Sequence, residues 1–148
     1  MTLNQKGKDL IIRFEGLKLE AYLCPANKWT IGVGSTFYED NSLVEDGDKI
    51  TRERALKLFD SIADKFAVGV RRLITKPLTT NQFSALVSFA FNCGLGNLRA
   101  STLLRKVNAN PNDPTIAAEF AKWDKVNKKV LRGLSIRRKA ESDLYFEK

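Results

Sequence analysis

Apolar residues recur at helical spacing in two stretches of the first half of the chain. Within residues 3–15, Leu10, Ile11 and Phe14 fall at positions i, i+1 and i+4, and Gly16 follows as a helix end. Residues 52–75 repeat this spacing over many turns, with Thr51 as the N-cap and Pro77 as the stop. The pattern predicts an N-terminal helix and a long second helix over these two ranges.

Between the two predicted helices the period of the apolar residues changes to two. Residues 29–33 alternate apolar side chains with small or polar ones, and residues 25–28 form a turn because they include Pro and Asn. A hairpin is therefore expected over about 19–35. The acidic stretch that follows, 36–50, is expected to be a loop or a ragged extra strand.

The second half of the chain predicts a succession of shorter helices. Thr79 and Gln82 match a capping box, and helical spacing follows as far as Asn92. Later apolar positions predict further helices over about 98–108, 113–123 and 134–146, with a basic loop before the last of them.

In chain order, these elements predict the α+β fold class in one domain, residues 1–148. We expect a small sheet lobe over about 16–50 and a connecting helix over about 52–75. A larger helical lobe is expected over about 78–146, together with the N-terminal helix over 3–15.

Histidine is absent from the 148 residues, and its absence excludes several kinds of catalysis. Neither a Ser-His-Asp nor a Cys-His arrangement is possible, and zinc sites that use His are excluded. The two cysteines cannot form a four-cysteine metal site, so no metal is expected. Catalysis would have to use carboxylates, thiols, hydroxyls or amines.

The net charge of the chain is +8, from 25 Lys and Arg against 17 Asp and Glu, and it is unevenly distributed. Residues 122–139 hold eight basic residues and one acid, whereas residues 39–48 hold five acids and no base. This distribution favours an anionic partner, such as nucleic acid, a membrane surface or an acidic polymer. The alternative is a basic face that contacts only solvent.

Three side chains suited to chemistry lie where the first helix meets the hairpin. Glu15 is expected in the last helical turn, where a carboxylate meets the negative end of the helix dipole. Cys24 and Thr30 flank the tip of the hairpin, and Tyr22 shares a strand face with Cys24. A carboxylic acid that faces a group able to position or activate water is the arrangement needed for glycoside hydrolysis.

Other interpretations of these residues stay open at the level of the sequence. Glu15 could pair with an arginine, such as Arg137 or Arg138, and tie two lobes together. Glu20 is a second candidate carboxylate because it shares the strand face of Cys24, although its distance from the turn favours a surface position.

The spacing of these residues resembles that of a known family. Glu15, Cys24 and Thr30 match the Glu-x8-(Asp/Cys)-x5-Thr triad of phage lysozymes, glycoside hydrolase family 24, together with the flanking FEG, AYxCP and WTIGxG. The resemblance continues through residues 78–94 and 101–104, and it ends with Trp123 and the motif GLxxRRxxE over residues 133–141. It covers nearly the whole chain in the right order.

The resemblance implies a lysozyme-like fold, with a small N-terminal β-hairpin lobe and a larger helical lobe joined by a long helix. It implies an endolysin muramidase that hydrolyses the β-1,4 bond between N-acetylmuramic acid and N-acetylglucosamine in bacterial peptidoglycan, with no cofactor. Glu15 would be the general acid. Cys24 and Thr30 would hold or activate the water, or stabilise the positive charge that develops on the sugar.

The same matching places three residues where the family binds its substrate: Thr36, Phe91 and Ser101. For Phe91 and Ser101, a purely structural role is an alternative to substrate binding. Phe91 fits a core aromatic of the predicted helix after residue 79, and Ser101 fits an N-cap of the next helix. Cys93 is expected to be a small buried residue at a helix end.

The chain departs from the family pattern at two positions. Cys24 stands where many relatives carry Asp, and a thiol is mostly uncharged near neutral pH unless its pKa is lowered. Cys24 could act as a nucleophile instead, which would change the stereochemical outcome. Ser35 stands where relatives commonly carry His, which leaves the packing behind the hairpin open.

The partners and location follow from the resemblance and from the start of the chain. No apolar signal-peptide core is present at the start, and no apolar run is long enough to span a membrane. We therefore expect synthesis in the host bacterial cytoplasm, release by a separate pore-forming, holin-type protein, and action as a monomer on the cell wall in the periplasm. The alternatives are a basic nucleic-acid-binding module and an additional membrane-disrupting activity of the basic C-terminal segment, with weak contact to anionic membranes.

Overall fold

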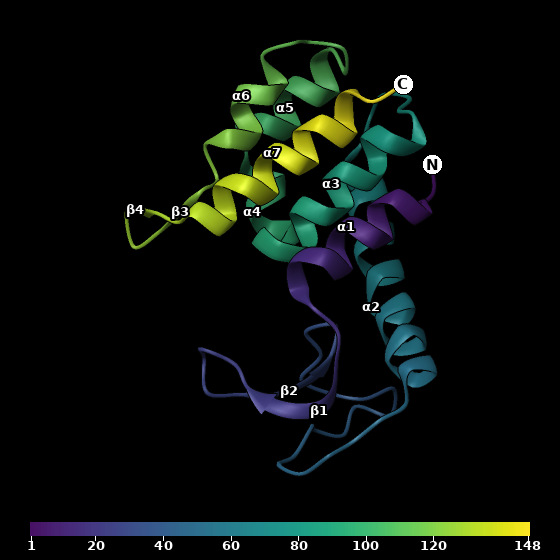
Figure 1. Cartoon of the computed structure of the whole chain (residues 1–148). Helices are drawn as coiled ribbons and strands as arrows, with labels where there is room; N and C mark the ends of the chain where they lie inside the picture. The colour runs from purple at the N-terminus through teal and green to yellow at the C-terminus, as the bar shows by residue number, and fades with distance from the viewer. The chain divides into compact units, whose positions relative to one another are not determined.

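The computed structural model describes residues 1–148 and begins with the helix α1 (Gln5–Glu15); a longer helix, α2 (Arg52–Leu73), follows the first hairpin (Figure 1). The chain forms two compact units, and each of these helices has residues in both of them. The hairpin unit is Ile11–Asp64, and the helical unit is Met1–Leu10 with Lys65–Lys148. Both helices agree with the apolar spacing of the sequence. The Thr51 side chain accepts a hydrogen bond from the backbone N–H of Arg54 at 3.1 Å, which confirms the predicted N-cap of α2.

The hairpin unit contains a short antiparallel pair, β1 (Lys18–Leu23) and β2 (Trp29–Gly32). Tyr22 lies opposite Thr30, and the register is irregular between Lys18 and Tyr22. The acidic stretch adds only isolated bridges, at Phe37 with Leu43 and at Glu20 with Lys49. The predicted hairpin is thus confirmed, with shorter strands than expected and a ragged continuation.

A small apolar core holds the hairpin unit together. It consists of four buried residues from β2, the acidic stretch and α2: Ile31, Tyr38, Val44 and Leu58. Ala21, Trp29, Ile50 and Ile62 pack around them. Burial on this scale anchors β2 and the start of α2, because full burial of one such side chain contributes about 1.5–3 kcal/mol.

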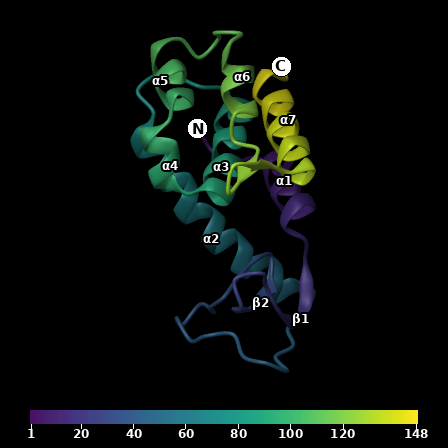
Figure 2. The same cartoon turned by 90° about the vertical axis from the view of Figure 1, so that its left-hand side faces the viewer.

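The helical unit is built around α3 (Thr80–Cys93), whose residues from Gln82 to Ala90 are all buried. The predicted capping box is present, since Thr79 and Gln82 bond each other through side chain and backbone. Helix α7 (Arg132–Phe146) lies along α3, as Figure 2 shows, and it also contacts α6 (Ile116–Ala121). No helix combines the length and the apolar composition that a membrane crossing needs.

Two features of the helical unit differ from the prediction. The single helix expected over 98–108 is two helices, α4 (Leu95–Ala100) and α5 (Thr102–Ala109), because the extended backbone of Ser101 ends the first and caps the second. The expected basic loop contains a hairpin, β3 (Lys125–Val126) and β4 (Lys129–Val130).

Candidate active site

Glu15 is the last residue of α1, and its side chain is half-buried. The helix ends there because Gly16 adopts a φ of 80°, which favours glycine, and its N–H donates to the Ile12 carbonyl at 2.8 Å. The chain then enters β1 directly. The predicted position of Glu15 between helix and hairpin is therefore confirmed.

Gly34, which follows β2, lies against the Glu15 carboxylate. A Cβ atom built on Gly34 would lie 3.3 Å from Glu15 Oε1, and Gly34 has a φ of 71°. Glycine thus satisfies two requirements at once, a left-handed backbone and room for the carboxylate. The Gly34 backbone is one wall of the site, and the sequence analysis did not single it out.

Cys24 and Thr30 meet at the tip of the hairpin, as the sequence predicts. The Cys24 N–H donates to the Lys28 carbonyl at 3.0 Å, and the Asn27 N–H donates to the Cys24 carbonyl at 2.9 Å. Asn27 takes a left-handed φ of 59°, which Asn tolerates better than most residues. This tight turn leaves the half-buried Cys24 thiol beside the buried Thr30 side chain.

Hydrogen-bond donors at the turn lower the pKa of the Cys24 thiol. The backbone N–H of Lys28 contributes most, and the Thr30 hydroxyl contributes next. The Thr30 hydroxyl also donates to the Lys28 carbonyl, at 2.9 Å. Its single hydrogen therefore has two acceptors, and ionisation of Cys24 favours the bond to sulfur.

The Tyr22 phenol interacts electrostatically with both Glu15 and Cys24. Burial raises the pKa of the half-buried Tyr22 phenol, and the charges of Cys24 and Glu15 raise it further. The phenol therefore lies within electrostatic reach of both groups. The hairpin unit thus brings together Glu15, Cys24, Thr30 and Tyr22.

Ser35, at the second departure from the family pattern, is only 3% exposed. Its backbone is paired in both directions with that of Ile31, at 2.8 and 2.9 Å. The Ser35 hydroxyl has no hydrogen-bond partner. Behind the hairpin, the short Ser35 side chain is therefore buried with an unpaired hydroxyl.

The predicted substrate-binding residues are divided between the two units. Thr36 is half-buried in the hairpin unit. In the helical unit, the half-buried ring of Phe91 packs against Phe66 at a centroid distance of 5.1 Å. Ser101 is 4% exposed and caps α5, since its hydroxyl accepts from the Leu104 N–H at 3.0 Å and donates to the Leu98 carbonyl at 2.7 Å. The substrate-binding roles of all three stay predictions.

The arginines named as candidate partners of Glu15 form a buried cluster with Glu141 in the helical unit. Arg137 and Arg138 contact Glu141 at 3.2 and 2.8 Å, and Ser88 donates to it at 2.6 Å. Arg138 also donates to Cys93 Sγ at 2.6 Å. A bond from either arginine to Glu15 stays a prediction.

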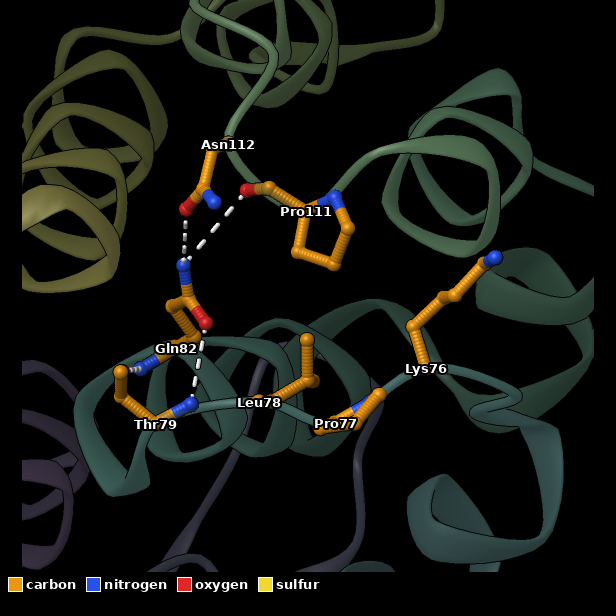
Figure 3. Close-up of a pocket in the computed structure, with 7 residues that line it drawn as sticks. All are labelled: Lys76, Pro77, Leu78, Thr79, Gln82, Pro111 and Asn112. Atoms are coloured by element: carbon orange, nitrogen blue, oxygen red, sulfur yellow. Dashed lines mark hydrogen bonds between the residues drawn. The ribbon is translucent and has the colours of Figure 1, made fainter.

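Metal-binding clusters and pockets were the other features that could indicate a site. No group of three or more Cys, Asp and Glu residues is arranged to hold a metal ion, and both cysteines are free thiols. A pocket of about 450 Å³ in the helical unit is lined by residues around Pro77, Gln82 and Pro111 (Figure 3). It includes none of the predicted catalytic or substrate-binding residues.

Comparisons with known proteins agree with this geometry. A family model described as phage lysozyme matches residues 12–141. The endolysin of Bacillus phage B103 is 43% identical over 147 residues, covering 98% of this chain and 54% of that protein, so the chain spans about half the length of that relative. The endolysin of Acyrthosiphon pisum secondary endosymbiont phage 1 is 42% identical over 149 residues, covering 98% of each chain.

A solved structure shows the same architecture. The endolysin from Escherichia coli O157:H7 phage FAHEc1 superposes with a TM-score of 0.92 at 37% identity, covering 99% of this chain and 94% of that one. The predicted α+β fold with a β-hairpin is therefore confirmed as a lysozyme fold. Together these findings show that the chain belongs to the phage lysozyme family, glycoside hydrolase family 24.

Proposed function

We propose that the chain is an endolysin muramidase that cleaves the β-1,4 bond between N-acetylmuramic acid and N-acetylglucosamine in peptidoglycan, with Glu15 as the general acid. The observation that supports this role is the position of the Glu15 carboxylate. Glu15 is the last residue of α1, and its carboxylate lies against the Gly34 backbone. The charges of Glu15 and Cys24 both raise the pKa of Tyr22, so the three side chains lie within electrostatic reach of one another.

Glu15 would protonate the glycosidic oxygen as the bond to the sugar breaks. The transition state resembles an oxocarbenium ion, so the leaving oxygen gains negative charge that a nearby acid can neutralise. A positioned general acid contributes about 10²–10⁴-fold to such a step. The half-buried position of Glu15 suits this task, because the carboxyl group reaches the surface and its neighbours hold it in place.

Two chemical roles fit Cys24. With Thr30, it can hold the water that attacks the sugar, and its lowered pKa increases the fraction of thiolate that stabilises positive charge. Alternatively, the thiolate attacks the sugar itself and forms a covalent intermediate. The first role releases a sugar of inverted configuration and the second a sugar of retained configuration, so proton NMR of the anomer first released distinguishes them.

The remaining parts of the proposal rest on family membership. Thr36, Phe91 and Ser101 would contact the glycan. Host lysis would require synthesis in the bacterial cytoplasm and a separate pore-forming, holin-type protein that gives the enzyme access to the wall. The enzyme would act as a monomer.

Analysis of the cleavage products tests the proposed bond specificity. Purified peptidoglycan is digested, the new reducing ends are reduced with borohydride, and the fragments are identified by mass spectrometry. A muramidase leaves N-acetylmuramic acid at every new reducing end. Reduced N-acetylglucosamine at those ends would instead show cleavage of the other glycosidic bond, and it would overturn the proposal.

A further inference from the structure

The three tyrosines of the chain differ in what their hydroxyl groups contact. The Tyr38 hydroxyl donates to Asp48 Oδ2 at 2.6 Å, and the Tyr145 hydroxyl donates to the Pro111 carbonyl at 2.7 Å. The Tyr22 hydroxyl, by contrast, makes no such bond within the protein, although the Tyr22 backbone is paired in the sheet. The residue is half-buried, so part of it is open to a ligand.

The position of Tyr22 on the hairpin places it in the candidate active site. Tyr22 lies directly opposite Thr30 across the antiparallel pair. Directly opposite residues share a face of the sheet, with Cβ atoms about 4.5–5.5 Å apart. Cys24 follows two positions later on the same face, and its backbone N–H continues the pairing to Lys28.

Tyr22 differs from its neighbours in the chemistry that it offers. Glu15 and Cys24 can exchange protons during the reaction. The pKa of the Tyr22 phenol is raised above its ordinary value, chiefly by burial and further by these two groups. The phenol is therefore a permanent hydrogen-bond donor at neutral pH, next to a carboxylate and a thiol.

We propose that Tyr22 is a substrate-contacting residue, whose hydroxyl donates a hydrogen bond to a hydroxyl or N-acetyl oxygen of the sugar bound beside Glu15 and Cys24. This inference rests on the proposed function of the site. The acceptor is an uncharged sugar oxygen. A hydrogen bond between uncharged groups contributes about 0.5–1.5 kcal/mol, which corresponds to about 2- to 13-fold in kcat/KM.

The variant Tyr22→Phe removes only the phenolic oxygen. We expect kcat/KM on soluble peptidoglycan fragments to fall about three- to tenfold. The thermal unfolding temperature should stay at the wild-type value, because no hydrogen bond within the protein is lost. The pH dependence of kcat/KM should keep its shape, because Tyr22 contacts the sugar and does not act through the protonation of Glu15 or Cys24.

The matched control is Tyr38→Phe, the other tyrosine of the hairpin unit. It loses the bond to Asp48, so its unfolding temperature should fall while kcat/KM of the folded enzyme is kept. Unchanged kcat/KM in Tyr22→Phe would overturn the inference, and so would a loss of stability like that of Tyr38→Phe. A shifted pH profile would also overturn it, since it would mean that Tyr22 acts through its neighbours.

The product analysis of the wild-type enzyme separates the two proposals. If the reducing ends carry N-acetylmuramic acid and Tyr22→Phe is fully active, only the inference on Tyr22 fails. If the wild-type enzyme leaves the other reducing end, the proposed function fails, whatever the effect of Tyr22→Phe.

Discussion

The ionisable side chains compared between the two units differ in how deeply they are buried. The helical unit encloses Glu141, which is fully buried, between Arg137 and Arg138, which are 3% and 0% exposed. The hairpin unit leaves Glu15 and Cys24 half-buried at the ends of its elements. A buried carboxylate needs compensating charges and so becomes part of the fold. A carboxylate at the surface can exchange a proton with a ligand.

The two cysteines repeat this contrast. Donors at the hairpin turn lower the pKa of Cys24, with the backbone N–H of Lys28 as the largest cause. Burial raises the pKa of Cys93, although the nearby Arg138 opposes the rise. We therefore expect the more reactive thiol in the hairpin unit, whereas the half-buried Cys93 thiol of the helical unit accepts a hydrogen bond from Arg138.

The largest effect on stability is expected from Glu141→Gln. The change removes the charge of the carboxylate that Arg137 and Arg138 both contact, and breaking a buried ion pair in this way costs about 3–5 kcal/mol. Urea unfolding measures the loss. Asp143→Asn is the control on the same helix, because Asp143 is exposed and its pair with Lys139 at 3.4 Å contributes about 0–1 kcal/mol. Equal stabilities of the two variants would remove the contrast between the units.

A change at Gly34 should separate backbone strain from displacement of Glu15. Gly34→Ala places a methyl group 3.3 Å from Glu15 Oε1 at a φ of 71°. We expect a stability loss of about 1–2 kcal/mol from the left-handed backbone and a fall in kcat/KM of about tenfold or more from the displaced carboxylate.

Gly47→Ala is the matched control for that change. Gly47 has a φ of 85°, and a Cβ built there has no neighbour within 4 Å. It should show the same loss of stability with full activity of the folded enzyme. Full activity in both variants would mean that the Gly34 backbone does not position Glu15.

Alkylation with iodoacetamide compares the two thiols directly. Cys24 should react about tenfold faster than Cys93 in the native protein, because only the thiolate reacts and only Cys24 has a lowered pKa. Its labelling should also begin at a lower pH than that of a free cysteine, and the labelling of Cys93 at a higher one. The rates are followed by mass spectrometry in Cys24→Ser and Cys93→Ser. Faster labelling of Cys93 would reverse the assignment.

The smallest effect on stability is expected at Ser35, where the sign of the change in the free energy of unfolding is the test. Ser35→Ala removes a buried hydroxyl that has no partner, so the free energy of unfolding should rise by about 1 kcal/mol. Ser88→Ala removes a buried hydroxyl that donates to Glu141, so the same measurement should show a loss. A loss in both variants would mean that the Ser35 hydroxyl contributes a favourable contact.

The parts of the fold that the sequence predicts well are those with long repeats or caps. The apolar spacing over α2 and the capping box at Thr79 indicate their helices without any tertiary information. The hairpin of β3 and β4 was missed, because its turn uses Asn127 and Lys128 at φ values of 50° and 67°, and Lys is not a usual left-handed residue. The N-cap alternative for Ser101 is confirmed, but the predicted helix over 98–108 ran through this residue, because a capping serine looks the same inside a helical pattern.

The candidate site could be predicted in part for a similar reason. Glu15, Cys24 and Thr30 lie close in sequence, so the end of one helix and one tight turn bring them together. The roles of Gly34 and Tyr22 depend on which atoms approach the Glu15 carboxylate, and a single sequence does not specify this. The i, i+2 spacing of Tyr22 and Cys24 was the one available signal.

Glu15 is proposed to supply the proton of the reaction, and the variant Glu15→Gln tests this role most directly. Lysis of outer-membrane-permeabilised Gram-negative cells and urea unfolding are measured on the same preparation, beside Glu20→Gln, which changes an exposed carboxylate of the same unit. We expect Glu15→Gln to remain folded and to lose activity by about 10²-fold or more, while Glu20→Gln behaves as wild type. Retained lysis by Glu15→Gln would contradict it.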